Sequence, residues 1–135
     1  MIRISAALFF AALLVAIPNL HGQASPGKIA SELDKLRTLS DKERPAATVK
    51  VATEISALPP GMEKVKFADS ASHLVTEGDQ GHDALQAVAD ALSKALAETP
   101  LPAKGDEPPM PYLDLARLAR YGHVAVSLEI GRAHV

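Results

Sequence analysis

The sequence predicts an all-α protein: a small bundle of about four to five short amphipathic helices after a signal peptide. Apolar residues recur at steps of three and four in successive segments, and proline or glycine separates these segments. Alanine, which favours helix, is frequent in the longest of them. We expect the bundle over residues 25–98, a proline-rich linker over 99–110, and a helix followed by the start of a strand over 111–128.

Residues 1–24 have the pattern of a signal peptide. A positive charge at Arg3 precedes an apolar run over residues 4–17, and Gly22 and Ala24 have the spacing that a signal peptidase reads. This pattern predicts cleavage after Ala24 and a periplasmic or secreted protein that does not bind membranes after cleavage. The alternative is an uncleaved membrane anchor, against which the shortness of the apolar run argues.

The first two helices have clear start or stop signals. Ser25 is expected to be the N-cap of the first helix, with Pro26 at its first helical position. Its apolar stripe comprises Ile29, Leu33, Leu36 and Leu39. Ser40 or Asp41 is expected to be the N-cap of the second helix, with Pro45 in its opening turn. The helix is expected to stop at residues 59–61, which read Pro-Pro-Gly. Its stripe comprises Ala47, Val51, Ile55 and Leu58.

The third and fourth helices are expected within residues 62–78 and 82–98. Gly78 is placed to end the third helix. The third stripe comprises Val65, Ala68, Ser72 and Val75, flanked by Phe67, Ala71 and Leu74. The fourth comprises Leu85, Val88, Leu92 and Leu96. We expect the first helix to pair with the second and the third with the fourth, which predicts an antiparallel bundle.

The linker over residues 99–110 is predicted from its prolines to be extended. A fifth helix is expected to open at Pro111 and to end near Gly122, with Tyr112, Leu115 and Leu118 on one face. Residues 123–128, "HVAVSL", alternate and contain two valines, which is typical of a strand.

The composition argues against several kinds of chemistry. The chain has no cysteine and no tryptophan, and none of its serines lies in a G-x-S-x-G context, so we expect no catalytic residue and no cofactor. The formal net charge of −2 and the scattered basic residues argue against a nucleic-acid partner.

The densest polar cluster is "SHLVTEGDQGHD", residues 72–83. His73 and Glu77 share a helix face, and the following turn would have to bring His82 back to them for a divalent metal to bind. The alternative is that these are solvated charges at helix ends. Because the sequence secures only two of three ligands, we predict no metal site here.

The last residues match a sequencing-library adapter. Read in one frame, a widely used adapter encodes Ile-Gly-Arg-Ala-His-Val and then a stop codon, and its first two bases complete a codon for Glu129. We therefore expect residues 129–135 to be an artefact, and the native reading frame to continue past Leu128.

Three runs resemble the N-terminal region of a family of exported bacterial redoxin proteins: "DKERPAATVKVATEISALPPGMEKVKFADSASHLVTEGDQG", "LQAVADALSKAL" and "YLDLARLARYGHV". In that family a helical lead-in precedes a thioredoxin-like domain of the TlpA-like, alkyl hydroperoxide reductase and thiol-specific antioxidant superfamily. The resemblance covers residues 28–128. The family's catalytic W-C-x-x-C motif has no counterpart in this chain, so no catalytic residue carries over.

The resemblance implies the non-catalytic N-terminal fragment of a secreted or periplasmic thiol-disulfide oxidoreductase, truncated before its redoxin domain. Its partner would be that missing C-terminal domain or another protein. Two alternatives remain from the residues themselves: a stand-alone exported helical binding or scaffold module, and a metal-binding domain that uses His73, Glu77 and His82.

Overall fold

The computed structural model describes residues 25–126, which contain five helices. These are α1 (Pro26–Leu36), α2 (Arg44–Ser56), α3 (Met62–Val75), α4 (Gly81–Glu98) and α5 (Met110–Gly122). No strand occurs among the described residues, so the all-α prediction is confirmed. No helix within this range has the length and apolar character needed to cross a membrane. The predicted signal peptide and residues 129–135 lie outside the described residues.

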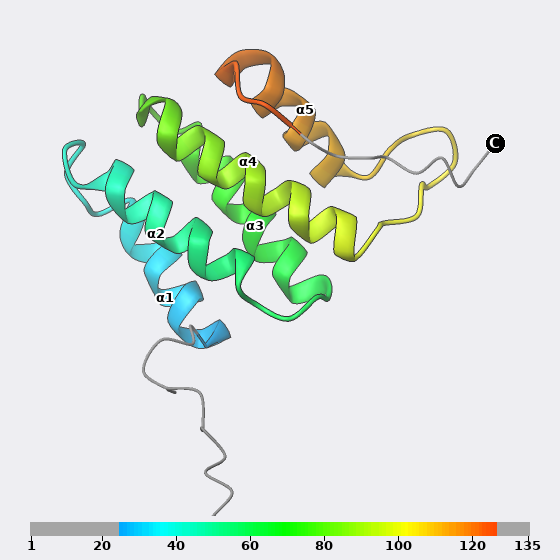
Figure 1. Cartoon of the computed structure of the whole chain (residues 1–135), viewed down its shortest axis with the longest axis horizontal. Coiled ribbons are helices and arrows are strands. Elements are labelled where there is room, and N and C mark those ends of the chain that lie inside the picture. The colour runs from blue at the N-terminus through cyan, green and yellow to red at the C-terminus, as the bar shows by residue number, and fades with distance from the viewer. Residues whose placement is uncertain (1–24, 127–135) are drawn as a thin grey trace, which may run out of the picture.

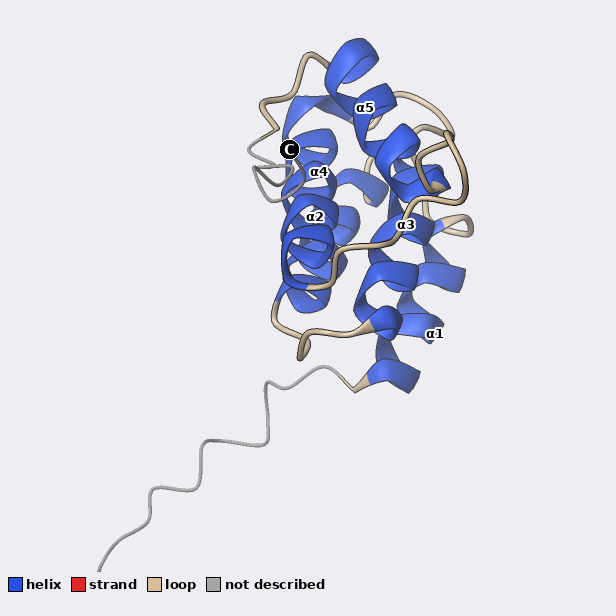
Figure 2. Cartoon of the chain, turned by 90° about the vertical axis from the view of Figure 1, so that its right-hand side faces the viewer, coloured by secondary structure: helices blue, strands red, loops and turns tan. Residues whose placement is uncertain are grey.

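The five helices form a two-layer stack. Successive helices run in alternating directions (Figure 1). Helices α2 and α4 lie in one layer, and α1, α3 and α5 lie in the other (Figure 2). Each helix contacts its neighbours in sequence and the next helix of its own layer, whereas α1 reaches neither α4 nor α5. Both predicted pairs, α1 with α2 and α3 with α4, are in contact.

Helix α4 has more buried residues than any of the other four helices. Its leucine and valine stripe is buried at Val88, Leu92 and Leu96, and small residues lie around this stripe. The buried alanines of α4 are Ala84, Ala89, Ala91 and Ala95. Because alanine has no side chain beyond Cβ, the helices on either side of α4 pack close to its backbone. The core is therefore aliphatic, and it includes residues from all five helices.

The start of α1 agrees with the sequence prediction, whereas the start of α2 differs. Ser25 is the N-cap of α1, and its hydroxyl accepts a hydrogen bond from the Lys28 amide at 3.3 Å. The predicted start of α2 at Ser40 or Asp41 is wrong, because a separate turn precedes the helix. In this turn the Ser40 hydroxyl accepts from the Glu43 amide at 3.3 Å and donates to the Glu43 carboxylate at 2.9 Å. Ser40 thus makes the hydrogen bonds expected of an N-cap, but they stabilise this turn and not the first turn of α2.

The connection from α3 to α4 requires glycine. The predicted end of α3 at Gly78 is too late, since the helix ends at Val75. Gly78 and Gly81 have φ of 119° and 79°, a region that side chains with a Cβ rarely adopt. These two residues reverse the chain between antiparallel helices.

The segment between α4 and α5 folds back onto the bundle. Lys104 and Glu107 form an isolated antiparallel bridge. The half-buried Leu101 packs against the core, and its amide donates a hydrogen bond to the Tyr112 hydroxyl at 3.1 Å. Helix α5 contacts both α3 and α4. Residues 110–122 therefore share the core of residues 26–98.

The chain after α5 does not pair as a strand over residues 123–126. The strand predicted from residue 123 onward is absent over residues 123–126, while Ser127 and Leu128 lie outside the described residues. The side-chain amide of Gln86 on α4 binds the Ala125 backbone at both ends, donating to its carbonyl at 2.8 Å and accepting from its amide at 3.0 Å. A glutamine side chain thus replaces the neighbouring strand as the partner of this segment.

Candidate functional site

Two aspartates and a histidine converge between α3 and α5. Asp69 and His73 are four residues apart on one face of α3, and Asp114 lies near the start of α5. The Nε2 atom of His73 lies 3.2 Å from Asp114 Oδ2 and 3.7 Å from Asp69 Oδ2. One ligand atom from each residue lies within 4.8 Å of the other two. We call Asp69, His73 and Asp114 the α3–α5 cluster.

Each carboxylate of the α3–α5 cluster has one buried oxygen that accepts no hydrogen bond from the described residues. Asp114 is 3% exposed; Arg117 donates to its Oδ1 at 2.9 Å, but its Oδ2 accepts no hydrogen bond within the described residues. The Oδ1 atom of Asp69 is likewise buried without a hydrogen-bond partner in this range. Burial, and next the negative charge of Asp114, raise the pKa of the Asp69 carboxyl. Arg117 forms an ion pair with Asp114, whereas Asp69 has no lysine or arginine within ion-pair distance among the described residues.

The imidazole of His73 remains accessible. Its side chain is 51% exposed. It lines a cavity of about 350 Å³ between α1 and α3, whose apolar lining includes Leu33 and Phe67. Two members of the α3–α5 cluster are thus partly or fully buried, while the third lies at the edge of an open cavity.

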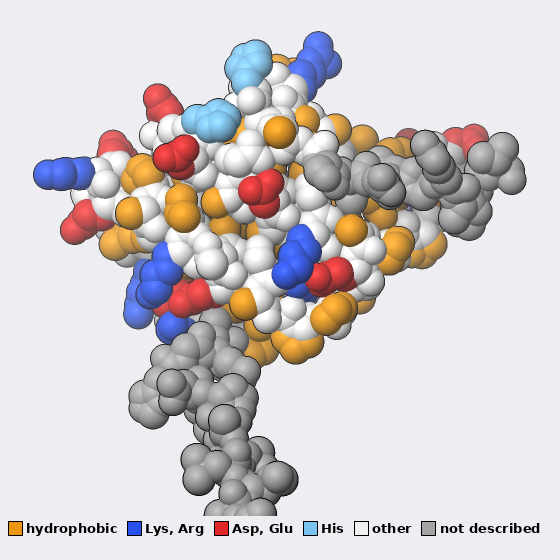
Figure 3. Space-filling view, viewed as in Figure 1, with side chains coloured by type: hydrophobic (Ala, Val, Ile, Leu, Met, Phe, Trp, Pro, Cys, Tyr) orange, Lys and Arg blue, Asp and Glu red, His pale blue; other side chains and the backbone are white. Residues whose placement is uncertain are grey.

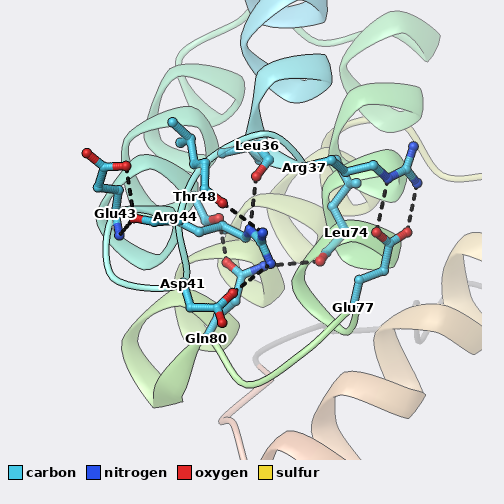
Figure 4. Close-up of polar contacts among 11 residues, drawn as sticks. Leu36, Arg37, Asp41, Glu43, Arg44, Thr48, Leu74, Glu77 and Gln80 are labelled. Atoms are coloured by element: carbon cyan, nitrogen blue, oxygen red, sulfur yellow. Dashed lines mark hydrogen bonds and ion pairs between the residues drawn. The ribbon is translucent and has the colours of Figure 1, made fainter.

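The structure does not bring together the three residues considered from the sequence as metal ligands. Glu77 faces the Arg37 guanidinium, whose Nη2 and Nε donate to the two carboxylate oxygens at 2.7 Å and 3.0 Å (Figure 4). His82 is exposed, and its Nδ1 lies 3.9 Å from a carboxylate oxygen of Asp83. Only His73 belongs to the α3–α5 cluster, where its partners are Asp69 and Asp114.

Arg37 and Arg44 line a second cavity, of about 230 Å³, at the end of α1. Arg44 donates to the carbonyls of Leu36 and Leu39 at 2.9 Å and 2.8 Å, and thereby caps the C-terminus of α1 (Figure 4). The Glu77 carboxylate neutralises Arg37 on the opposite wall. Since both guanidinium groups already have protein partners, this cavity offers no free cation to an anionic ligand.

The bidentate pair of Arg37 and Glu77 leads to a titration prediction. The hydrogen bonds and charge of Arg37 lower the pKa of the Glu77 carboxyl. The pair therefore stabilises the fold above the ordinary glutamate pKa, and this contribution is lost as the pH falls through the lowered value. In Arg37→Ala we expect the Glu77 pKa to return toward its ordinary value, as measured by carboxyl NMR titration. A pKa that stays low would contradict the assignment.

A second pair of carboxylates lies between α1 and α2, but lysines balance it. The Lys28 ammonium lies 3.0 Å from Glu54 and 3.7 Å from Glu32. The Lys50 ammonium lies 3.3 Å from Glu32 and 4.0 Å from Glu54. Two positive charges thus face two negative ones, although one oxygen of each glutamate is buried without a hydrogen-bond partner among the described residues.

Lys64 is a charged residue that the fold buries. It is 2% exposed, and its ammonium donates to the Ser56 and Leu58 carbonyls at 2.8 Å and 3.0 Å. A third bond, at 2.8 Å, reaches the Glu98 carboxylate. Lys64 therefore joins the end of α2 and the start of α3 to the end of α4, a structural role that uses all three ammonium hydrogens.

A smaller buried network joins α2 to the connection between α3 and α4. The Thr48 hydroxyl donates to the Gln80 side-chain oxygen at 2.6 Å, and the Gln80 amide nitrogen donates to the Leu74 carbonyl at 3.1 Å. Both Thr48 and Gln80 are buried. This network lacks a titratable group, so its role is structural.

On the face drawn in Figure 3, basic and acidic side chains lie in small mixed groups separated by apolar and uncharged residues. Neither sign of charge forms a continuous patch on this view of the described residues. Comparisons with protein-family models, with curated proteins and with solved structures find no match for this chain. The α3–α5 cluster is therefore assigned from its geometry alone.

Proposed function

We propose that this chain is the non-catalytic helical N-terminal region of an exported thiol-disulfide oxidoreductase. The supporting observation is the resemblance over residues 28–128, a stretch that includes nearly all of α1 and the whole of α2 to α5. Because these helices share one core, the region is suited to act as a module that holds a catalytic domain or a protein partner. The thiol chemistry would reside in residues other than the ones described here.

The outer surface of α5 supports a docking role for this module. Leu113 and Tyr121 are 42% and 72% exposed, and Met110 at the start of the helix is 55% exposed. These side chains lie on the last helix of the stack, which contacts α3 and α4 but has no described helix on its other side. An adjoining thioredoxin-like domain would cover this apolar surface.

Sequencing the gene beyond the codon for Leu128 tests the proposal. We expect the reading frame past Leu128 to encode a thioredoxin-like domain with a C-x-x-C motif, and the purified full-length product to reduce or oxidise a disulfide substrate. A frame that ends soon after Leu128, or one that continues without paired cysteines, would rule out the oxidoreductase.

A second candidate function is a stand-alone exported helical module that binds or scaffolds a protein. The observation that favours it is the single aliphatic core, which needs no further domain to bury the apolar faces of α2 and α4. Residues 25–128 alone would then unfold in one cooperative transition. A molten state that binds hydrophobic dyes would instead favour dependence on a missing domain.

A further inference from the structure

We infer that Asp69, His73 and Asp114 form a binding site for a divalent transition-metal ion between α3 and α5. Two carboxylate oxygens and one imidazole nitrogen are supplied, which is the number of protein ligands in an open metal site. The ligands come from two helices, so an ion bound here would also join α3 to α5.

The spacing of the three ligand atoms fits a small ion. Ligands at about 2.0–2.2 Å from a tetrahedral metal lie about 3.3–3.6 Å from one another. The distance of 3.2 Å from His73 Nε2 to Asp114 Oδ2 is close to this range, and the 3.7 Å to Asp69 Oδ2 exceeds it slightly. The ligand oxygens of Asp69 and Asp114 lie within 4.8 Å of each other, so a bound ion would require the Asp69 side chain to rotate toward the other two ligands.

The buried oxygens of the cluster provide the second, independent observation. Asp114 is 3% exposed, and its Oδ2 points toward His73 without accepting a hydrogen bond from the described residues. A buried carboxylate oxygen without a hydrogen-bond donor carries a large desolvation cost unless a cation lies next to it. Arg117 pairs with the other oxygen of Asp114, Oδ1, at 2.9 Å, so Oδ2 is the oxygen left to bind a cation beside His73.

The donor set indicates the class of metal. Calcium and magnesium prefer sites made entirely of oxygen, whereas an imidazole with carboxylates suits zinc, iron, cobalt or nickel. Soft thiolate ligands are absent from the chain, which has no cysteine. The half-exposed His73 leaves the remaining coordination positions open to water or to a ligand in the cavity between α1 and α3.

The experiment is a titration of the purified, untagged protein with Zn²⁺ and Co²⁺. We expect one equivalent of Zn²⁺ to bind by calorimetry and Co²⁺ to give visible absorption bands characteristic of protein coordination. His73→Ala and Asp69→Asn should each weaken Zn²⁺ binding by at least about tenfold. Because neither residue is fully buried, these variants should retain the wild-type circular dichroism spectrum.

Two matched controls separate this site from the ligand set considered from the sequence. His82→Ala removes an exposed histidine, and Glu77→Gln removes a carboxylate one turn beyond His73; both should bind Zn²⁺ as the wild type does. Asp114→Asn should abolish the cobalt bands, provided that its circular dichroism spectrum shows a folded protein. Wild-type affinity in His73→Ala, or equal losses in His73→Ala and His82→Ala, would overturn the assignment.

Discussion

We expect Leu92→Ala to lower the free energy of unfolding by about 2–5 kcal/mol. Leu92 is fully buried at 0% exposure in the middle of α4, where α2 and α3 pack against it. Its neighbours Ala91 and Ala95 cannot extend into the space that the mutation leaves. The cavity should therefore remain open, which places the loss toward the upper part of the range. Urea unfolding monitored by circular dichroism measures it.

Leu113→Ala is the matched control for Leu92→Ala, since Leu113 is a helical leucine that is 42% exposed. Truncating a partly solvated side chain removes less buried area than truncating Leu92 and leaves no enclosed cavity. Its midpoint in urea should be close to the wild-type value. Comparable losses in the two variants would show that α4 is not the centre of the core.

Lys64→Met should lower the free energy of unfolding by about 1–3 kcal/mol. Methionine preserves most of the side-chain volume, so the change removes the ammonium and its three hydrogen bonds without leaving a large cavity. The Ser56 carbonyl keeps a second donor in Lys94 at 2.8 Å, and Glu98 is 26% exposed and reaches water. The buried Leu58 carbonyl bears most of the cost, because it loses the Lys64 donor.

Lys66→Met provides the control, since Lys66 lies two residues further along α3 and is exposed. Both substitutions remove one positive charge, so a general charge effect would change the two variants equally. Thermal or urea unfolding at the same ionic strength separates the two cases. If Lys66→Met destabilises as much as Lys64→Met, the three hydrogen bonds of Lys64 contribute little.

The metal-ligand prediction illustrates where sequence reasoning fails. Within one helix, spacing places His73 near both Asp69 and Glu77, because each is four residues away. What separates the two acidic residues is α5, which brings Asp114 to the side of α3 that carries Asp69. Glu77 instead faces Arg37 at the end of α1. Arg37 and Glu77 are 40 residues apart in the sequence, and a contact over this distance leaves no periodic pattern.

Local patterns determined the helices of this protein, since apolar spacing, Ser25 and the prolines act within a few residues of the chain. Most residues in the predicted stripes are buried, whereas Leu39, Ala47, Leu85 and Tyr112 are only partly buried. Leu39 and Leu58 lie just beyond the helix ends. Tertiary packing alone decided which polar groups were removed from water. Lys64 is buried and Lys66 is exposed, although both are lysines of one helix. The physical reason is that desolvation depends on the surfaces that α2 and α4 place over α3, and these surfaces are set by the whole fold.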